Sequence, residues 1–216
     1  MRRREAPPLA RFGWRKWSSA AALGVSRQPG SLTAALRRVG PVEVKLLRQG
    51  PARPDRHERA VLGRQAGRVA VVREILLFCA GSPVIYGRTA IVPGDLRGAW
   101  RALSSLGTRA LGDFIFSDRA IVRGPFVVKR LARADPMLRR IRGTPAFASN
   151  SCDDPTPPGV RRRLIVRRGR AVVLTEAFLS RFPAEALGAP SPLGLIGLLG
   201  PPAAGAPATG HGGALL

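Results

Sequence analysis

The stretch that decides the fold is VAVVREILLFCAGSPVIYGRTAIV, residues 69–92. It contains two runs rich in β-branched and large apolar residues, 69–79 and 83–92, with the short turn Ala80-Gly81-Ser82 between them. Two such runs joined by a short turn that contains glycine are typical of an antiparallel hairpin. The middle of the chain is therefore predicted to form a pair of antiparallel strands.

A second hairpin is predicted further along the chain, at residues 161–167 and 171–179 around Arg168-Gly169-Arg170. The other expected elements are strands at 42–47, 114–116 and 120–129, helices at 14–23, 31–39, 57–62 and 95–106, and a basic loop or short helix at 135–142. The sum is an α+β fold, a single mainly antiparallel β-sheet with a few flanking helices on one side.

The length of the chain suits one domain of ordinary size, which we place at residues 13–183. Residues 1–12 combine charge and proline with little apolar periodicity, which predicts a disordered basic tail. Residues 143–159 have the composition of a loop and are interpreted as an insertion into the domain. Residues 184–216 are nearly all Ala, Gly, Pro and Leu, which predicts a low-complexity tail.

The formal net charge of +23 is the most prominent feature of the composition, and it would suit nucleic acid, an acidic surface or an anionic substrate. Of the 36 basic residues only Lys16, Lys45 and Lys129 are lysines, and Ala, Gly and Pro are abundant, a pattern that also follows from a GC-rich genome. The arginines are spread along the chain without a recognition motif or stacking aromatic residues. We therefore expect no nucleic acid among the partners.

Only two cysteines occur, Cys79 and Cys152, so their spacing supports neither a disulfide framework nor a four-cysteine zinc site. A reducing, cytoplasmic location is therefore expected. The longest apolar run of the expected domain, residues 69–77, is interrupted by Arg73 and Glu74 and is too short to span a bilayer. We expect no membrane span, and we expect a monomer.

Two charges stand where apolar residues belong. Alternate residues of a strand share a face, so Arg73 shares its face with Val71 and Ile75, and Glu176 shares its face with Leu174. A charge in a core needs a partner. The pattern leaves two readings open: a buried salt bridge between Arg73 and Glu176, or a pocket in which the guanidinium grips a ligand carboxylate and the acid meets a hydroxyl or takes a proton.

At these strands the sequence resembles the chorismate pyruvate-lyase family of ubiquinone biosynthesis. The matching segments, in the order of the family, are 30–33 (GSLT), 72–77 (VREILL), 87–89 (GRT) with 92–93 (VP), 106–107 (LG) followed by 111–112 (LG) and Phe116, and 174–179 (LTEAFL). Each segment is short, but five in the right order at suitable separations make a specific signal. They cover residues from about 14 to 182.

The resemblance implies a single antiparallel sheet that closes over a buried site, in which chorismate loses pyruvate to leave 4-hydroxybenzoate. It implies that Arg73 and Glu176 hold the ligand and carry the chemistry, and that Leu32 and Leu111 also contact it. No cofactor or metal is expected, because the aromatic product supplies the driving force. It stays open whether Glu176 takes a proton or only positions the substrate, because an internal hydrogen transfer within chorismate is also chemically possible.

Two other function classes stay in play beside the lyase. A similar fold serves as the ligand-sensing domain of some bacterial transcription regulators, but such a sensor would normally be fused to a helix-turn-helix domain, and the segment before Trp14 is too short for one. A basic nucleic-acid-binding protein is the third class, and it would require the arginines to cover one contiguous face.

Overall fold

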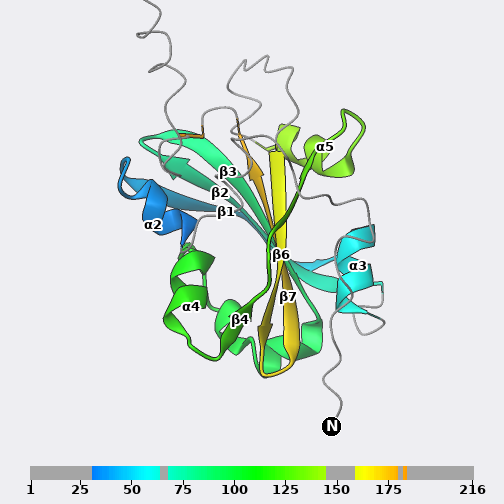
Figure 1. The fold of residues 1–216 in the computed structure, drawn as a ribbon. Helices are drawn as coiled ribbons and strands as arrows, with labels where there is room; N and C mark the ends of the chain where they lie inside the picture. The colour runs from blue at the N-terminus through cyan, green and yellow to red at the C-terminus, as the bar shows by residue number, and fades with distance from the viewer. Residues whose placement is uncertain (1–30, 64–67, 145–158, 180–181, 184–216) are drawn as a thin grey trace, which may run out of the picture.

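The computed structural model describes residues 31–63, 68–144, 159–179 and 182–183, and within them the strands form one seven-stranded sheet (Figure 1). The strands are β1 Val42–Ala52, β2 Ala70–Cys79, β3 Ser82–Ile91, β4 Ile121–Arg123, β5 Val127–Arg130, β6 Gly159–Arg167 and β7 Arg170–Phe178. Their order in the sheet is β1-β2-β3-β7-β6-β4, and β5 also pairs with β6. Every pairing is antiparallel, which confirms the predicted fold class.

Both predicted hairpins are present, and together they form the four central strands. The turn between β2 and β3 places Ala80 at φ 48° and Gly81 at φ 76°, and the turn between β6 and β7 places Arg168 at φ 49° and Gly169 at φ 73°. Two successive residues with positive φ match the right-handed twist of the flanking strands. Strand β3 pairs with β7 and so joins the two hairpins.

Helices cover both faces of the sheet rather than the one face that the sequence suggested. Helix α2 (Leu32–Leu36) and helix α4 (Leu111–Ser117) lie on one side, and helix α3 (Arg56–Leu62) and helix α5 (Pro136–Arg142) lie on the other (Figure 1). The core is divided accordingly, because α2 and α4 pack on one set of alternating strand residues and α3 and α5 pack on the other. The central strands are thus buried on both faces, whereas the edge strand β1 is largely exposed.

Three local predictions were wrong. Residues 114–116, expected as a strand, belong to α4, where Leu111 and Ile115 bury one helical face at a spacing of four residues. The helix expected at 95–106 is replaced by two short 3₁₀ helices, Pro93–Arg97 and Arg101–Leu103. The strand expected at 120–129 is divided into β4 and β5 around Gly124 and Pro125, since proline cannot donate to the ladder.

Strand β1 extends to Ala52, well beyond the predicted end at residue 47. Pro51 pairs with Val71 of β2, and β1 lies at the edge of the sheet, where a missing N–H group leaves no partner unsatisfied. The expected helix at 14–23, the tails at 1–12 and 184–216 and nearly all of the insertion at 143–159 lie outside the described residues. In the part of the chain that the structure describes, no helix is long and apolar enough to cross a membrane.

Candidate active site

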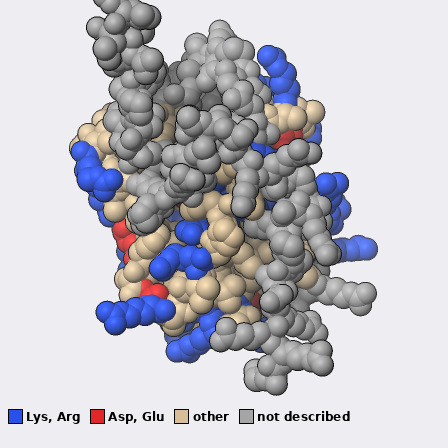
Figure 2. All heavy atoms as spheres, in the orientation of Figure 1, with Lys and Arg blue, Asp and Glu red and all other residues tan. Residues whose placement is uncertain are grey.

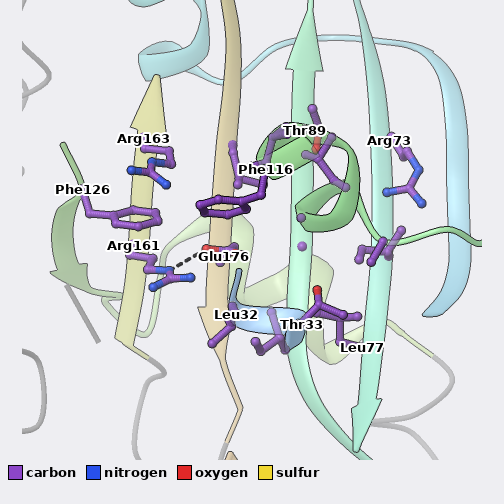
Figure 3. Close-up of a pocket in the computed structure, with 18 residues that line it drawn as sticks. Leu32, Thr33, Arg73, Leu77, Thr89, Phe116, Phe126, Arg161, Arg163 and Glu176 are labelled. Carbon is purple, nitrogen blue, oxygen red and sulfur yellow. Dashed lines mark hydrogen bonds and ion pairs between the residues drawn. The ribbon is translucent and has the colours of Figure 1, made fainter. Parts of the chain in front are cut away.

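The face of the sheet beneath α2 and α4 forms the floor of a pocket (Figure 3). Four strands contribute to this floor in two adjacent rows of cross-strand partners. The first row is Arg73, Thr89, Leu174 and Arg163, and the second row is Ile75, Gly87, Glu176 and Arg161. Because every member of a row lies on a different strand, side chains far apart in the sequence meet in one hollow.

Arg73 is buried, with 7% of its surface exposed, and it enters the pocket from β2. Its Nη2 donates to the carbonyl oxygens of Gly107, at 2.8 Å, and Arg109, at 3.0 Å. Its Nε is buried and has no hydrogen-bond partner among the described residues. Burial lowers the pKa of this guanidinium. Arg73 is therefore a desolvated cation with an unused donor, as a binding group for an anion requires.

Glu176 enters the same pocket from β7, and it pairs with Arg161 of β6 rather than with Arg73. Arg161 Nε donates to Glu176 Oε2 at 2.5 Å, and both side chains are largely buried. Arg73 and Glu176 form no ion pair with each other, because Arg73 bonds only backbone carbonyls within the described residues. Of the two readings of these charges, the direct salt bridge is thus wrong.

Helices α2 and α4 cover the pocket, and each begins at a pocket residue. Leu32 is the first residue of α2 and Leu111 is the first residue of α4, and both line the pocket. A bidentate pair ties the two helices together, with Arg37 Nη1 and Nη2 at 2.9 and 2.8 Å from the carboxylate oxygens of Asp113. Gly112 allows their close approach, since a Cβ atom at this position would lie 2.6 Å from Ser31 Oγ.

Three further residues line the pocket that the sequence analysis did not assign to the site: Arg161, Arg163 and Phe126. The Phe126 ring lies between the two guanidiniums, with its centroid 4.0 Å from the Cζ of Arg161 and 3.9 Å from that of Arg163 (Figure 3). The run of arginines at 161–163 was visible only as a charge run. Alternation along β6 could have indicated that its first and third members share the face of Glu176.

The opposite face of the same strands carries a second, separate ion network. Arg88 is 2% exposed and donates from Nε and Nη2 to Glu58 of α3, at 2.8 and 3.0 Å, and from Nη1 to Glu74. Glu74 follows Arg73 directly in β2, so the two side chains point to opposite faces of the sheet, and Glu74 pairs with the buried Arg88. On the same face, Arg162 donates from Nε to Thr175 Oγ1 and from Nη2 to the Asp55 carboxylate, both at 2.7 Å.

The pocket is suited to an anion. Its charged lining residues are Arg73, Arg161, Arg163 and Glu176, which leave two positive charges in excess. Its space is about 580 Å³, including the open mouth. Burial, and next the neighbouring Arg161, lower the pKa of Arg163 to about 10, which leaves it charged at neutral pH. Among the described residues, no group of three or more His, Cys, Asp and Glu side chains could hold a metal ion.

Comparison with known proteins identifies the family of this chain. The model of the family described as "Chorismate lyase" matches residues 17–183. The chain belongs to the chorismate lyase family. As a member of this family it is an enzyme of the lyase class.

Proteins with similar sequences align with most of the length of this chain. A protein named "Probable chorismate pyruvate-lyase" from Halorhodospira halophila is 41% identical over 149 residues, which are 69% of this chain and 76% of that protein. A protein of the same name from Ralstonia nicotianae is 36% identical over 196 residues, 87% of this chain and 91% of that protein. Among solved structures, the chain is similar to PhnF from Mycobacterium smegmatis at 18% identity and a TM-score of 0.49, over 73% of this chain and 67% of that one.

The four residues that the family resemblance implied as ligand contacts all line one pocket of this chorismate lyase family member. Arg73 and Glu176 lie on its floor, and Leu32 and Leu111 lie at the starts of the two covering helices. Their roles toward a ligand stay predictions.

Proposed function

We propose that the protein eliminates pyruvate from chorismate and leaves 4-hydroxybenzoate, the first committed step toward ubiquinone. One observation carries this proposal: a pocket with two positive charges in excess, lined by Arg73, Arg161, Arg163 and Glu176. Chorismate carries two carboxylates, so the substrate would neutralise the pocket. The matching family and the names of its relatives support the same reaction.

The reaction makes the ring aromatic. The ring carbon that bears the hydroxyl loses its hydrogen, the C–H electron pair forms the new ring double bond, and the neighbouring C–O bond of the ether breaks. The ether oxygen leaves with the electron pair of the broken C–O bond as enolpyruvate. Enolpyruvate takes up one proton on carbon to become pyruvate, which balances the proton lost from the ring. Because the substrate supplies the driving force, the protein needs mainly to orient the dianion, exclude water and stabilise the charge on the leaving group. No cofactor enters this scheme.

Arg73 binds the ring carboxylate in this proposal. Its guanidinium is buried and its Nε has no partner among the described residues, so a carboxylate would satisfy this donor in the desolvated pocket. Its position is fixed before the substrate arrives, because the carbonyl groups of Gly107 and Arg109 hold its Nη2. A cation that is already oriented loses little freedom on binding.

Glu176 accepts a hydrogen bond from the ring hydroxyl. Its Oε2 is taken by Arg161, and its Oε1 accepts no hydrogen bond from the described residues, so Oε1 is the atom available to the substrate. Leu32 and Leu111 cover the ring from the starts of α2 and α4, where both side chains are buried. These apolar covers exclude water from the reacting carbons.

The protein acts as a monomer in the cytoplasm under this proposal. Floor and cover of the pocket come from a single chain, so a second subunit is not needed to complete it. A dianion such as chorismate does not cross membranes unaided, so its enzyme must share its compartment. Figure 2 shows the Lys and Arg side chains of the drawn face in separate groups, with uncharged residues and a few acidic side chains between them. The described part of this face does not favour nucleic acid as a partner.

Incubation of the purified protein with chorismate tests the proposal, with 4-hydroxybenzoate followed by absorbance and pyruvate by a coupled dehydrogenase. Equal amounts of both products are expected. Arg73→Met and Glu176→Gln should each lower kcat/KM on the order of 100-fold, whereas Glu43→Gln, the same change on the exposed edge strand β1, should have no effect. A folded protein that releases neither product contradicts the function, and full turnover by Glu176→Gln contradicts the role of that residue.

A further inference from the structure

Arg163 and Arg73 occupy the two ends of one row across the pocket floor. The row runs from Arg73 on β2 through Thr89 and Leu174 to Arg163 on β6. Three strand spacings separate the two backbones, roughly 14 Å. Figure 3 shows the two guanidiniums on opposite sides of the hollow, with Glu176 between them. A ligand that lies on the floor therefore has a cation at each end.

The two arginines share a second property: neither forms an ion pair with an acid among the described residues. Arg73 donates to the carbonyls of Gly107 and Arg109, and Arg163 donates from Nε and Nη2 to the carbonyl of Gly124, at 3.1 and 2.9 Å. Arg161, in contrast, is neutralised by Glu176. The pocket thus holds two guanidiniums without an acid, and desolvated charges of this kind require a partner.

Arg163 is held in place by an aromatic ring. Its Cζ lies 3.9 Å from the centroid of Phe126, and the same ring lies 4.0 Å from the Cζ of Arg161. The ring separates two like charges that alternation along β6 places on one face. Together with the Gly124 carbonyl, Phe126 fixes the guanidinium before a ligand binds, and Nη1 has no partner among the described residues.

We propose that Arg163, positioned by Phe126, binds the second carboxylate of the substrate, the one on the enolpyruvyl group that leaves. This inference rests on the proposed function and deepens it. With the ring carboxylate on Arg73 and the ring hydroxyl on Glu176, the enolpyruvyl group extends toward β6. Arg163 then holds the charge of the leaving group, while Arg161 holds Glu176.

Arg163 and Arg73 should differ in which ligands they bind. Chorismate has two carboxylates, but 4-hydroxybenzoate has only the ring carboxylate. Arg163 should therefore contribute to the binding of the substrate and not to that of the product, whereas Arg73 should contribute to both. Loss of pyruvate would leave Arg163 without its anion.

The experiment compares two ligands on the same variants. KM for chorismate is measured by product formation and Kd for 4-hydroxybenzoate by isothermal titration calorimetry. Arg163→Met should raise the KM by about tenfold or more and leave the Kd within about twofold, because one charge-assisted contact is lost. Arg73→Met should raise both. Arg119→Met removes the same charge from an exposed position outside the pocket and should change neither.

Two more variants guard against a purely structural role. Arg163→Lys keeps the charge without the planar fork and should give an intermediate KM, and Phe126→Leu keeps Arg163 but removes the stacked ring and should raise the KM by about threefold. Melting temperatures show whether each variant is folded.

The outcomes are distinguishable. A wild-type protein that converts chorismate, with Arg163→Met and Arg163→Lys at the wild-type KM, overturns this inference and leaves the proposed function intact. Equal increases in KM and in Kd in these variants also overturn it, since they indicate general damage to the pocket. A folded wild-type protein without turnover overturns the proposed function itself.

Discussion

Arg161 holds Glu176 across neighbouring strands, with Arg161 Nε 2.5 Å from Glu176 Oε2 on the floor of the pocket. The two residues are direct cross-strand partners in the pairing of β6 with β7. Their ion pair fixes the acid that lines the pocket floor, and it also neutralises one of the three pocket arginines. The geometry of the site and the stability of the sheet therefore depend on the same contact.

This contact predicts strong coupling between the two residues. Arg161→Met should lower the free energy of unfolding by about 3 kcal/mol, because it leaves the Glu176 carboxylate buried without its partner. The double variant Arg161→Met/Glu176→Gln should recover at least half of that loss, because the unpaired charge is gone. Urea unfolding of the wild type, both single variants and the double variant measures the coupling. If the losses in free energy of unfolding of the two single variants add up to the loss of the double variant, the ion pair does not contribute to stability.

The close approach of the two covering helices predicts a sensitive position at Gly112. A Cβ atom there would lie 2.6 Å from Ser31 Oγ, so Gly112→Ala should force α4 away from α2 and open the pocket. We expect the Kd for 4-hydroxybenzoate to rise by about tenfold, with a loss of stability of about 1–2 kcal/mol from overpacking. Gly94→Ala is the matched control, since no atom lies within 4 Å of its added Cβ. Unchanged binding in Gly112→Ala would mean that the two helices do not cover the ligand.

The network on the opposite face predicts a pH dependence of stability. Burial acts to raise the pKa of Asp55, but the charge and hydrogen bond of Arg162 outweigh it and hold the pKa below its usual range. A carboxylate with a lowered pKa in the folded state stabilises the fold above its unfolded pKa of about 3.9, and this contribution is lost as the pH falls through the folded pKa.

Asp55→Asn should therefore be less stable than the wild type by about 2 kcal/mol at pH 7, and the difference should shrink below about pH 4. The midpoints of urea unfolding of both proteins at pH 7 and pH 3 measure this difference in stability. Glu43→Gln is the control, because its side chain is exposed on the edge strand β1 and should contribute little at either pH. A constant difference between wild type and Asp55→Asn across this range would exclude the assigned ion pair.

The hairpins could be predicted from the sequence because their information is local. The run 69–92 carries its own strand pattern and its own turn, and Ala80 and Gly81 adopt the positive φ values that such a turn requires. Helix α4 could not be predicted, since a run as short as residues 114–116 fits a strand and a helix equally well. Its helical form is selected by packing, where Leu111 and Ile115 contact the sheet.

For the pocket, alternation along single strands predicted that Arg73 and Glu176 each point into the core, but their shared floor and their partners depend on the register between strands. Glu176 lies opposite Arg161 only because β6 and β7 pair around Gly169. Phe126 could not be predicted at all, because it reaches the two arginines from a separate segment beside β5. The resemblance to a family supplied Leu32 and Leu111, which no pattern of strand residues would have indicated.

Neighbouring residues of the central strands serve opposite sides of the molecule. Arg73 precedes Glu74, Thr175 precedes Glu176, and Arg162 stands between Arg161 and Arg163, so that within each strand alternate positions belong to different networks. Deleting a single residue from one of these strands would exchange the two networks beyond that point. We therefore expect such strands to tolerate substitutions of amino acids far more readily than changes of length, and insertions and deletions in relatives to fall in the connections between strands.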